Sequence, residues 1–320
     1  MKLVIAGGAG YIGGTVAALL IKAGHEVIVL DNLSHGYRSA VPEGARFIEG
    51  NVADFGTIFS GADNIEAVLH FAAYIEAGES VKQPEKYWLN NTVSSLKLLE
   101  AMRQLGIKKL VFSSTAAVYG EPETVPITEQ AVKNPTNPYG MTKLAVDMAI
   151  ASECVAHGLA AVSLRYFNVA GTYDGHGERH QPETHIIPVA LAAAANNRLF
   201  TIFGDDYPTA DGTCVRDYIH VYDLAQAHLL ALDKLEAGHA VYNLGNGAGF
   251  SNRQVVQTIE SVTGKKLAST VGPRRAGDPA VLVASSRLAE QELGWKPEKP
   301  DLETMVEDAW RFYQNQAGKD

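Results

Sequence analysis

Short apolar runs alternate with segments of helical periodicity over the first half of the chain. Residues 2–6 form an apolar run that glycines end, residues 11–23 follow with helical spacing, and Gly24 is a natural end for that helix. Further apolar or β-branched runs follow, and helical stretches separate most of them: 26–30, 45–50, 66–72, 109–114 and 160–167. Strands that alternate with helices predict an α/β fold with a doubly wound parallel sheet.

The pattern changes after about residue 168. Residues 172–185 are polar with Gly, His and Pro, and regular alternation of strands and helices becomes sparse. Residues 222–244 are an exception, because a helical stretch there precedes a strand that could return to the main sheet. We therefore expect a main domain, a smaller discontinuous α/β C-terminal domain, and a ligand cleft between them. The expected boundaries are 1–167 with 222–247 for the main domain, and 168–221 with 248–320 for the smaller one.

Composition is that of an ordinary globular protein, since 46% of the 320 residues are hydrophobic and 20% are charged. The net charge of −9 argues against sequence-independent nucleic-acid or membrane-surface binding, so we expect neither partner. No apolar run approaches the length of a membrane span, and the apolar start is too short for a signal peptide. The two cysteines, Cys154 and Cys214, are expected to be reduced thiols of a cytoplasmic protein.

The first predicted strand is followed by Gly7, Gly10 and Gly13 in GxxGxxG spacing. In a dinucleotide-binding loop, the first glycine permits a tight turn, the second admits a pyrophosphate, and the third lets the helix pack close to the strand. A glycine triplet alone could be a structural turn, but Asp31 closes the second strand where a ribose-binding carboxylate belongs. We therefore predict a Rossmann-type NAD site, because this carboxylate would repel the 2′-phosphate of NADP.

Two polar residues lie close to the third apolar run. Asn51 and Asp54 are placed to approach the adenine of a bound dinucleotide. Asparagine and aspartate are also common helix caps, and a helical stretch follows them, so the sequence leaves both roles open.

A tyrosine and a lysine lie four residues apart at the start of a predicted helix. Asn137 is a good N-cap and Pro138 suits the first helical position, so Tyr139 would lie in the first turn and Lys143 on the same face. The helix N-terminus, the ammonium group and the positive nicotinamide ring of bound NAD would all favour a phenolate. On a random helix such a pair would merely pack on the surface, but beside a dinucleotide loop it predicts a general base.

A hydroxyl group is expected to hold the oxygen of the substrate. The fifth strand of the sheet ends in Ser113, Ser114 and Thr115, and side chains at the carboxyl edge of a parallel sheet reach the ligand crevice. We choose Thr115 for this role and keep Ser114 as the alternative, although either hydroxyl could simply cap a turn.

Five motifs occur in order along the chain: GGAGYIG, HFAA, SSTAAVYG, YGMTK and RYFN. Through them the chain resembles the extended short-chain dehydrogenases/reductases. Two later segments resemble, within that family, the UDP-glucose 4-epimerases (UDP-galactose 4-epimerases): FGDDYPTADGTCVRDYIHV at 203–221 and YNLGNG at 242–247. The resemblance extends to about residue 312.

The resemblance implies an NAD-dependent inversion of C4 of a UDP-hexose, which interconverts UDP-galactose and UDP-glucose through a 4-keto sugar. Tyr139 would take the proton of the 4-hydroxyl, Lys143 would lower the pKa of Tyr139 and hold the nicotinamide ribose, and Thr115 would hydrogen-bond the 4-oxygen. Hydride would pass to NAD and return to the opposite face of the sugar. A homodimer with one tightly held NAD per subunit, and no metal, is also implied.

The resemblance further implies which residues bind each ligand. For NAD they are Gly7, Gly10, Tyr11, Ile12, Gly13, Asp31, Asn32, Asn51, Val52, Phe71, Ala72, Ala73, Asn90, Ser113, Tyr139, Lys143 and Tyr166. For the UDP-sugar they are Thr115, Asn168, His185, Arg216, Arg275, Asp278 and Leu282, with Asp278 on the uridine ribose. Two guanidinium groups suit a diphosphate because each can bind it through two hydrogen bonds, although either arginine alone could be an ion-pair residue.

Four positions depart from the best-known pattern of these enzymes. Asn51 replaces a frequent aspartate near adenine, Ile75 replaces a lysine near the pyrophosphate, and His185 replaces a frequent asparagine beside the sugar-nucleotide. Leu282 occupies a position where relatives have either tyrosine or a smaller residue beside the sugar ring. We hypothesise from this intermediate size that N-acetylated UDP-sugars are tolerated to some extent.

Other functions on the same scaffold are weighed against this one. A 4,6-dehydratase or decarboxylase would need an acid and a base after the strand-five hydroxyl, where this chain has Ala116 and Ala117. An epimerase of UDP-N-acetylglucosamine, UDP-glucuronate or UDP-arabinose is harder to separate from the sequence alone. A non-catalytic NAD-binding protein is disfavoured because such proteins usually lack the Tyr139–Lys143 pair.

Overall fold

The computed structural model of the chain describes residues 1–275 and 278–317. Its main sheet has seven strands in the order β11-β6-β5-β4-β1-β2-β3, and every neighbouring pair is parallel. The strands are β1 (Lys2–Ala6), β2 (Glu26–Asp31), β3 (Arg46–Glu49), β4 (Ala67–His70), β5 (Lys109–Thr115), β6 (Ala160–Tyr166) and β11 (Gly238–Leu244). This sheet confirms the predicted α/β fold.

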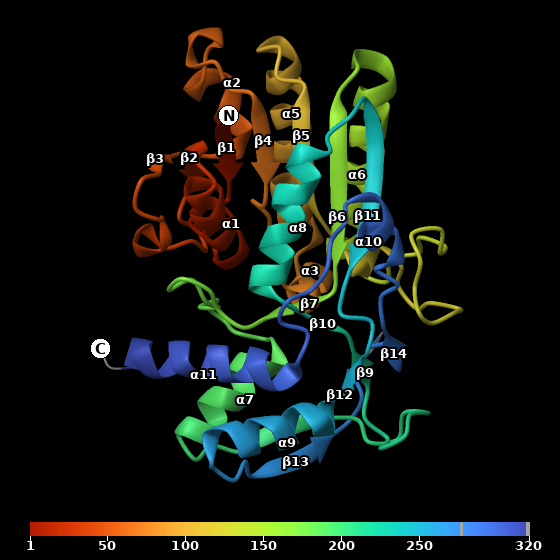
Figure 1. Ribbon diagram of the computed structural model, residues 1–320. Helices are drawn as coiled ribbons and strands as arrows, with labels where there is room; N and C mark the ends of the chain where they lie inside the picture. The colour runs from red at the N-terminus through yellow and green to blue at the C-terminus, as the bar shows by residue number, and fades with distance from the viewer. Residues whose placement is uncertain (276–277, 318–320) are drawn as a thin grey trace.

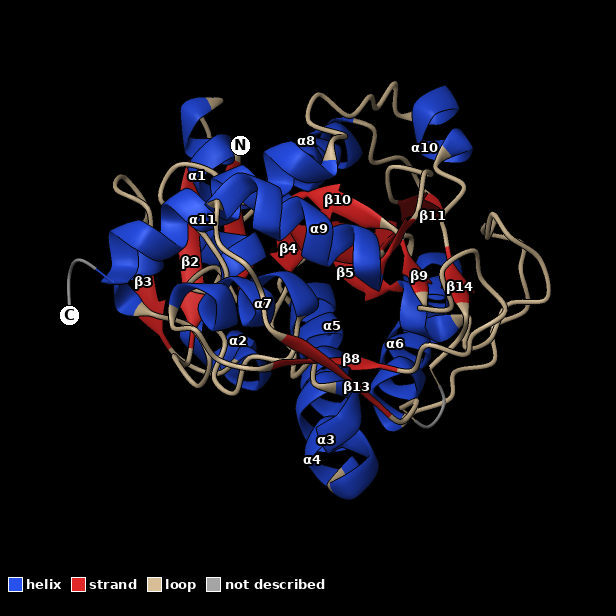
Figure 2. Cartoon of the chain, turned by 90° about the horizontal axis from the view of Figure 1, so that it is seen from below, coloured by secondary structure: helices blue, strands red, loops and turns tan. Residues whose placement is uncertain are grey.

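Helices cover both faces of this sheet (Figure 2). One face packs against α1 (Tyr11–Lys22) and α8 (Val221–Asp233), and the other packs against α2 (Phe55–Ile58), α5 (Ser94–Gln104) and α6 (Pro138–His157). Alternate residues of β1 therefore enter different cores: Leu3 and Ile5 lie in the first, while Val4 lies in the second. A strand buried on both sides must be apolar at every position, which explains its unbroken hydrophobic run.

The strand order reverses beside β1, because β2 lies on one side of it and β4 on the other. In a doubly wound sheet, ligands bind in the crevice outside the carboxyl ends of the strands at such a reversal. The glycine loop that follows β1 and the segment that follows β4 both open onto this point, which fixes where a cofactor can bind.

The remaining elements gather below the main sheet in Figure 1. Three small sheets occur there: β10-β7, β12-β9-β14 and β13-β8. The strands are β7 (Asn168–Ala170), β8 (Phe200–Phe203), β9 (Val215–Arg216), β10 (Tyr218–His220), β12 (Phe250–Ser251), β13 (Ser269–Gly272) and β14 (Val281–Leu282). The main helices are α7 (Ile186–Ala195), α9 (Asn252–Thr263) and α11 (Leu302–Ala317), and a shared apolar core joins them. Regular structure is more abundant here than the sequence pattern predicted.

The described part of the chain shows how the segment after α8 rejoins the main sheet. Strand β11 pairs in parallel with β6 along its whole length, and α8 packs on the core beneath α1. On this basis we propose the two-domain division of 1–167 with 222–247 and 168–221 with 248–320, in which 276–277 and 318–320 lie outside the described residues. Among the described helices, none is both long enough and apolar enough to cross a membrane.

Candidate active site

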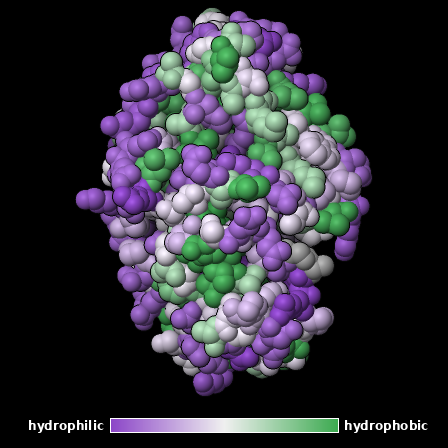
Figure 3. Space-filling model, turned by 90° about the vertical axis from the view of Figure 1, so that its right-hand side faces the viewer, coloured by the Kyte–Doolittle hydropathy of each residue, from purple (hydrophilic) through white to green (hydrophobic). Residues whose placement is uncertain are grey.

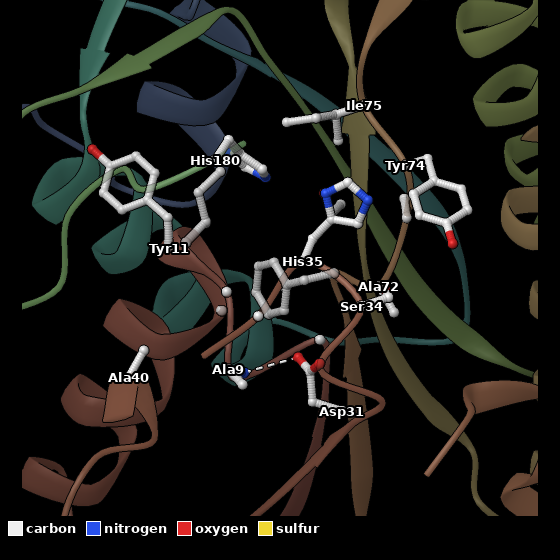
Figure 4. A pocket seen from close by; sticks show the side chains of 18 of the residues that line it. Ala9, Tyr11, Asp31, Ser34, His35, Ala40, Ala72, Tyr74, Ile75 and His180 are labelled. Carbon is white, nitrogen blue, oxygen red and sulfur yellow. Dashed lines mark hydrogen bonds between the residues drawn. The ribbon is translucent and has the colours of Figure 1, made fainter. Parts of the chain in front are cut away.

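A cleft of about 300 Å³ opens at the carboxyl edge of the main sheet (Figure 4). It is lined by all seventeen residues that the sequence analysis assigned to NAD, together with three assigned to the UDP-sugar, Thr115, Asn168 and His185. These residues come from segments spread between positions 7 and 185, so only the fold brings them together. Their convergence in one cleft supports the predicted roles.

The glycine loop leaves no room for side chains at two of its positions. Gly7 has a φ of +87°, and a Cβ atom there would lie 2.5 Å from the backbone nitrogen of Ala72. A Cβ atom on Gly13 would lie 2.3 Å from the carbonyl oxygen of Gly7. Helix α1 starts directly after this loop without a side-chain cap, so its first N–H groups point toward the cleft and can bind an anion.

Asp31 ends strand β2 and lies at the wall of the cleft (Figure 4). One carboxylate oxygen accepts a hydrogen bond from the Ala9 backbone at 3.0 Å, and the other accepts one from the Leu33 backbone at 2.8 Å. Burial raises the pKa of Asp31 although these two bonds lower it. The carboxylate is thus fixed in place, and each oxygen keeps a further lone pair for a ribose hydroxyl.

Asn51 and Asp54 prove to have different positions. The side chain of Asn51 accepts a hydrogen bond from the Ala53 backbone at 2.9 Å, which caps a short 3₁₀ turn, and Asn51 also lines the cleft. Asp54 is exposed, makes no side-chain cap and does not line the cleft. Capping is therefore confirmed for Asn51, and contact with adenine is open to Asn51 but not to Asp54.

The start of helix α6 places Tyr139 and Lys143 as predicted. Asn137 caps the helix by accepting a hydrogen bond from the Gly140 backbone at 2.9 Å, and Pro138 occupies the first turn. Lys143 lies one turn after Tyr139, and its Nζ donates to the carbonyl oxygen of Ser113 at 2.8 Å. Both side chains line the cleft, so the pair stands beside the glycine loop.

Burial has the largest effect on the pKa values of this pair. Burial raises the pKa of Tyr139 to about 12, although a hydrogen bond with Thr115 lowers it. Burial also lowers the pKa of Lys143 to about 7, so this side chain is only partly an ammonium ion at neutral pH. The sequence analysis considered the charges near Tyr139 but not the loss of solvation, which dominates for both groups.

The structure distinguishes between the two candidate hydroxyls at the end of β5. Thr115 lines the cleft beside Tyr139, and its hydroxyl lowers the pKa of that tyrosine, whereas Ser114 is buried outside the cleft and donates to Asp147 Oδ2 at 3.1 Å. Asp147 also accepts from Arg165 at 2.8 and 3.1 Å, and this ion pair is almost fully buried. Ser114 therefore belongs to a polar network beneath the site, and Thr115 is the hydroxyl that a ligand can reach.

Four residues assigned to the UDP-sugar lie outside the main cleft. Arg216 donates to the carbonyl oxygens of Val215 and Pro279 and lies 3.5 Å from the carboxylate of Asp278. Arg275 and Asp278 line a second cavity, where Arg275 lies over the ring of Phe203. Leu282 packs against the apolar cluster that contains Phe167. The assignment of these four residues to the UDP-sugar therefore stays a prediction, and the residues lie apart from Thr115, Asn168 and His185 in this structure.

The second cavity nevertheless adjoins the first through a single segment. His185 lines the main cleft, while its neighbours Thr184 and Ile186 line the second cavity. The chain at 183–186 thus lies between the two spaces.

The sequence analysis missed several residues of the cleft. They are polar or aromatic and line its outer part: His35, Tyr37, Tyr74, His176, Glu178, Arg179 and His180. Four of them lie in the polar segment 172–185, whose composition could have indicated a ligand-binding loop. Its histidines and glutamates face the loop after β2, a contact that no local pattern predicts.

The cleft fits the dinucleotide that the glycine loop predicts. No side chain fits at positions 7 and 13, so a diphosphate can approach the backbone there. The first turn of α1 offers free N–H groups to bind it. The fixed carboxylate of Asp31 stands at the end of β2, as the ribose hydroxyls of NAD require.

Comparison with known proteins agrees with this geometry. A UDP-glucose 4-epimerase of Corynebacterium glutamicum is 56% identical over 98% of this chain and 95% of its own length. The crystal structure of a Brucella ovis UDP-glucose 4-epimerase in complex with NAD is 44% identical with a TM-score of 0.93, and the match covers 98% of each chain. The Bifidobacterium longum UDP-glucose 4-epimerase in complex with NAD+ and UDP is 35% identical with a TM-score of 0.94 over both whole chains. Residues 3–245 match the NAD dependent epimerase/dehydratase family, and the chain belongs to that family.

Proposed function

We propose that this enzyme inverts C4 of a UDP-hexose with NAD as cofactor and so interconverts UDP-galactose and UDP-glucose. The observation that carries the proposal is the placement of Tyr139, Thr115 and Lys143 in one cleft with the glycine loop. The relatives named above are UDP-glucose 4-epimerases that cover almost the whole chain, and two of the solved structures contain NAD.

Each residue of the trio has a defined role in the proposal. Thr115 and Tyr139 line the same cleft and would hold the oxygen on C4 between them. Tyr139 takes the proton of the 4-hydroxyl and later returns it, while Lys143 stabilises the phenolate from one helical turn away. NAD, when bound, supplies the reversible acceptor for the hydrogen on C4. Its positive ring lowers the cost of the phenolate that burial alone imposes.

The UDP group would occupy the second cavity. Arg216 and Arg275 are the candidate partners of the diphosphate, and Asp278 is the candidate partner of the uridine ribose. In the present arrangement Arg216 is paired with Asp278, so substrate binding would replace this contact with one to phosphate.

Dehydration is the weaker alternative on this scaffold. Ala116 and Ala117 follow the Thr115 hydroxyl in a short 3₁₀ turn, and neither can transfer a proton at C5 or C6 of the sugar. Tolerance for N-acetylated UDP-sugars stays a prediction, because Leu282 lies behind Phe167 and the cleft wall would have to open for it to contact the sugar.

A homodimer in the cytoplasm is part of the proposal. Exposed large hydrophobic side chains occur on two adjacent stretches: Trp88, Leu89, Val93 and Leu96 before and within α5, and Met141, Met148 and Val155 on α6. On the face shown in Figure 3, hydrophobic residues lie in small groups among hydrophilic ones. Pairing of two such helix pairs would bury this apolar surface. The two buried thiols, Cys154 and Cys214, suit a reducing compartment.

The direct test is to incubate purified protein with UDP-galactose and no added cofactor, and to measure UDP-glucose by chromatography. Conversion is the expected result, since the net reaction consumes no NAD and a tightly held cofactor would survive purification. Failure to convert UDP-galactose even with NAD supplied would overturn the proposal and would point to another nucleotide-sugar.

A further inference from the structure

Four side chains able to bind a metal ion converge on the outer wall of the cleft. Glu178, His180, Glu183 and His185 each offer one ligand atom, and these atoms all lie within 4.8 Å of one another. All four belong to the segment before α7, in the spacing E-x-H-x-x-E-x-H. Neither the cofactor-binding loop nor the catalytic trio contains any of them.

The contacts within this cluster are already short. His185 Nδ1 lies 2.8 Å from Glu183 Oε1 and 4.0 Å from Glu178 Oε2, and His180 Nδ1 contacts Glu178 Oε1. In a tetrahedral zinc site with bonds of about 2.1 Å, neighbouring ligand atoms are roughly 3.4 Å apart. The distances in the cluster bracket this value, so small side-chain rotations would complete a four-coordinate site.

A second observation comes from the opposite wall of the cleft. His35 and Glu76 form a further candidate set with His180, and Figure 4 shows His35 and His180 facing the same space. The Glu76 side chain is only 9% exposed, and its Oε1 atom is buried without a hydrogen-bond partner. His35 Nδ1 is the nearest charged neighbour of this oxygen, at 3.7 Å, which is too long for a hydrogen bond. The buried oxygen therefore keeps its capacity to bind a cation or a donor.

The charge of this region calls for a cation. The carboxylates of Glu178 and Glu183 lie on one partly buried wall and that of Glu76 lies on the other. In the described part of the chain their salt-bridge partners are histidines, and no lysine or arginine pairs with any of the three. Neutral imidazole and carboxylate groups together are ligands that first-row divalent ions bind well.

We propose that Glu178, His180, Glu183 and His185 bind a single divalent transition-metal ion, with Zn²⁺ as the best match to the donor set. His180 links this ion to His35 and Glu76 on the other wall. The sequence analysis expected no metal, and of these four residues it assigned a role only to His185, beside the UDP-sugar. The ion would fix the segment 178–185, which forms the outer wall of the cleft, against the loops that follow β2 and β4.

The test is a calorimetric titration of tag-free, NAD-saturated protein with ZnCl₂ after removal of metal by a chelator. We expect one Zn²⁺ per chain, and a rise in the melting temperature with added Zn²⁺ because the ion binds only the folded state. Co²⁺ in place of Zn²⁺ should give a visible absorption spectrum typical of nitrogen and oxygen ligands in a four-coordinate site.

The matched variants separate this site from unspecific binding. The double variant His180→Gln/Glu183→Gln should bind Zn²⁺ at least about tenfold more weakly, because it removes two of the four ligands. The control His157→Gln/Glu153→Gln removes a surface histidine–glutamate pair on α6, and should leave the affinity unchanged. Circular dichroism of the metal-free variants verifies folding. Absence of saturable binding at one ion per chain, or equal affinity in the cluster variant and the original protein, would overturn the proposal.

Discussion

The two walls of the cleft are built in different ways. The wall formed by the parallel sheet is preset: its glycines admit no side chain, its carboxylate is held by two backbone groups, and a buried ion pair lies beneath it. The opposite wall consists of polar segments. Beyond that wall, in the region of short strands, Arg216 and Arg275 are engaged with protein groups. The comparison indicates that the cofactor site exists before ligand binding, whereas the substrate site is completed by it.

The largest expected effect concerns the chemistry at the preset wall. Replacement of Tyr139 by Phe should reduce turnover of UDP-galactose by about 10² to 10⁴-fold, the usual contribution of a general base. The NAD content, measured after denaturation, should be unchanged because the ring still fills the same space.

Tyr313→Phe is the matched control, since this hydroxyl lies on α11 and accepts a hydrogen bond from Asn196. Turnover that survives in the Tyr139 variant would show that another group removes the proton. Parallel loss of NAD would show that the tyrosine is needed to build the cofactor wall, so the comparison between the two walls would have to be redrawn.

The next effect compares one ion pair from each region. Asp147→Asn should lower the free energy of unfolding by about 3–5 kcal/mol, because the pair with Arg165 is buried and the guanidinium would lose its partner. Asp206→Asn removes a pair with Arg274 in which the aspartate side chain is 72% exposed, and should cause no measurable change.

Urea denaturation of both variants at neutral pH measures the difference. Similar losses from the two substitutions would contradict the view that only the sheet region is rigidly built. A stable Asp147 variant would mean that the existing hydrogen bond from Arg165 to the Tyr119 hydroxyl is enough to hold the guanidinium.

A further effect is a pH dependence of stability that arises in the sheet region. Burial lowers the pKa of His70 to about 3, with a further contribution from Lys143, and burial lowers that of His228 to about 4. The unfolded chain therefore binds protons first when the pH falls below about 6.5, so the folded state loses stability between about pH 6.5 and 4. The limiting slope is about 1.4 kcal/mol per pH unit for each histidine.

Denaturation curves at pH 6.5, 5.5 and 4.5 measure this slope. The variant His228→Gln should reduce the slope of stability against pH. It removes a histidine whose buried Nε2 has no partner, and which only the unfolded chain protonates in this pH range. Stability that rises toward acid would be the opposite sign and would show that these histidines are charged in the folded protein.

Most of the main sheet could be predicted from the sequence, because the signals are local. Continuous apolar runs indicate strands that are buried on both faces. Asn137 and Pro138 mark the start of α6. The glycine spacing and Asp31 likewise identified the cofactor wall, since strand, turn and helix follow one another along the chain.

The lower region was predicted less well for the same reason. Its strands have two to four residues, too few to show alternation, and they pair with partners distant in the chain, such as β13 with β8. The positions of Arg216 and Arg275 depend on those pairings. The sequence therefore could not predict that Arg216 contacts Val215, Pro279 and Asp278 while Arg275 lies over the ring of Phe203.

The sequence by itself determined the α/β architecture, the dinucleotide loop, and the presence of Tyr139 and Lys143 one helical turn apart. Each of these follows from residues close in the chain, whose preferences for turns, caps and burial act locally. Only the tertiary structure decided the protonation of that pair, the choice of Thr115 over Ser114, and the meeting of His35, Glu76 and His180. Solvation and contact between distant segments control these properties, and both exist only once the chain has folded.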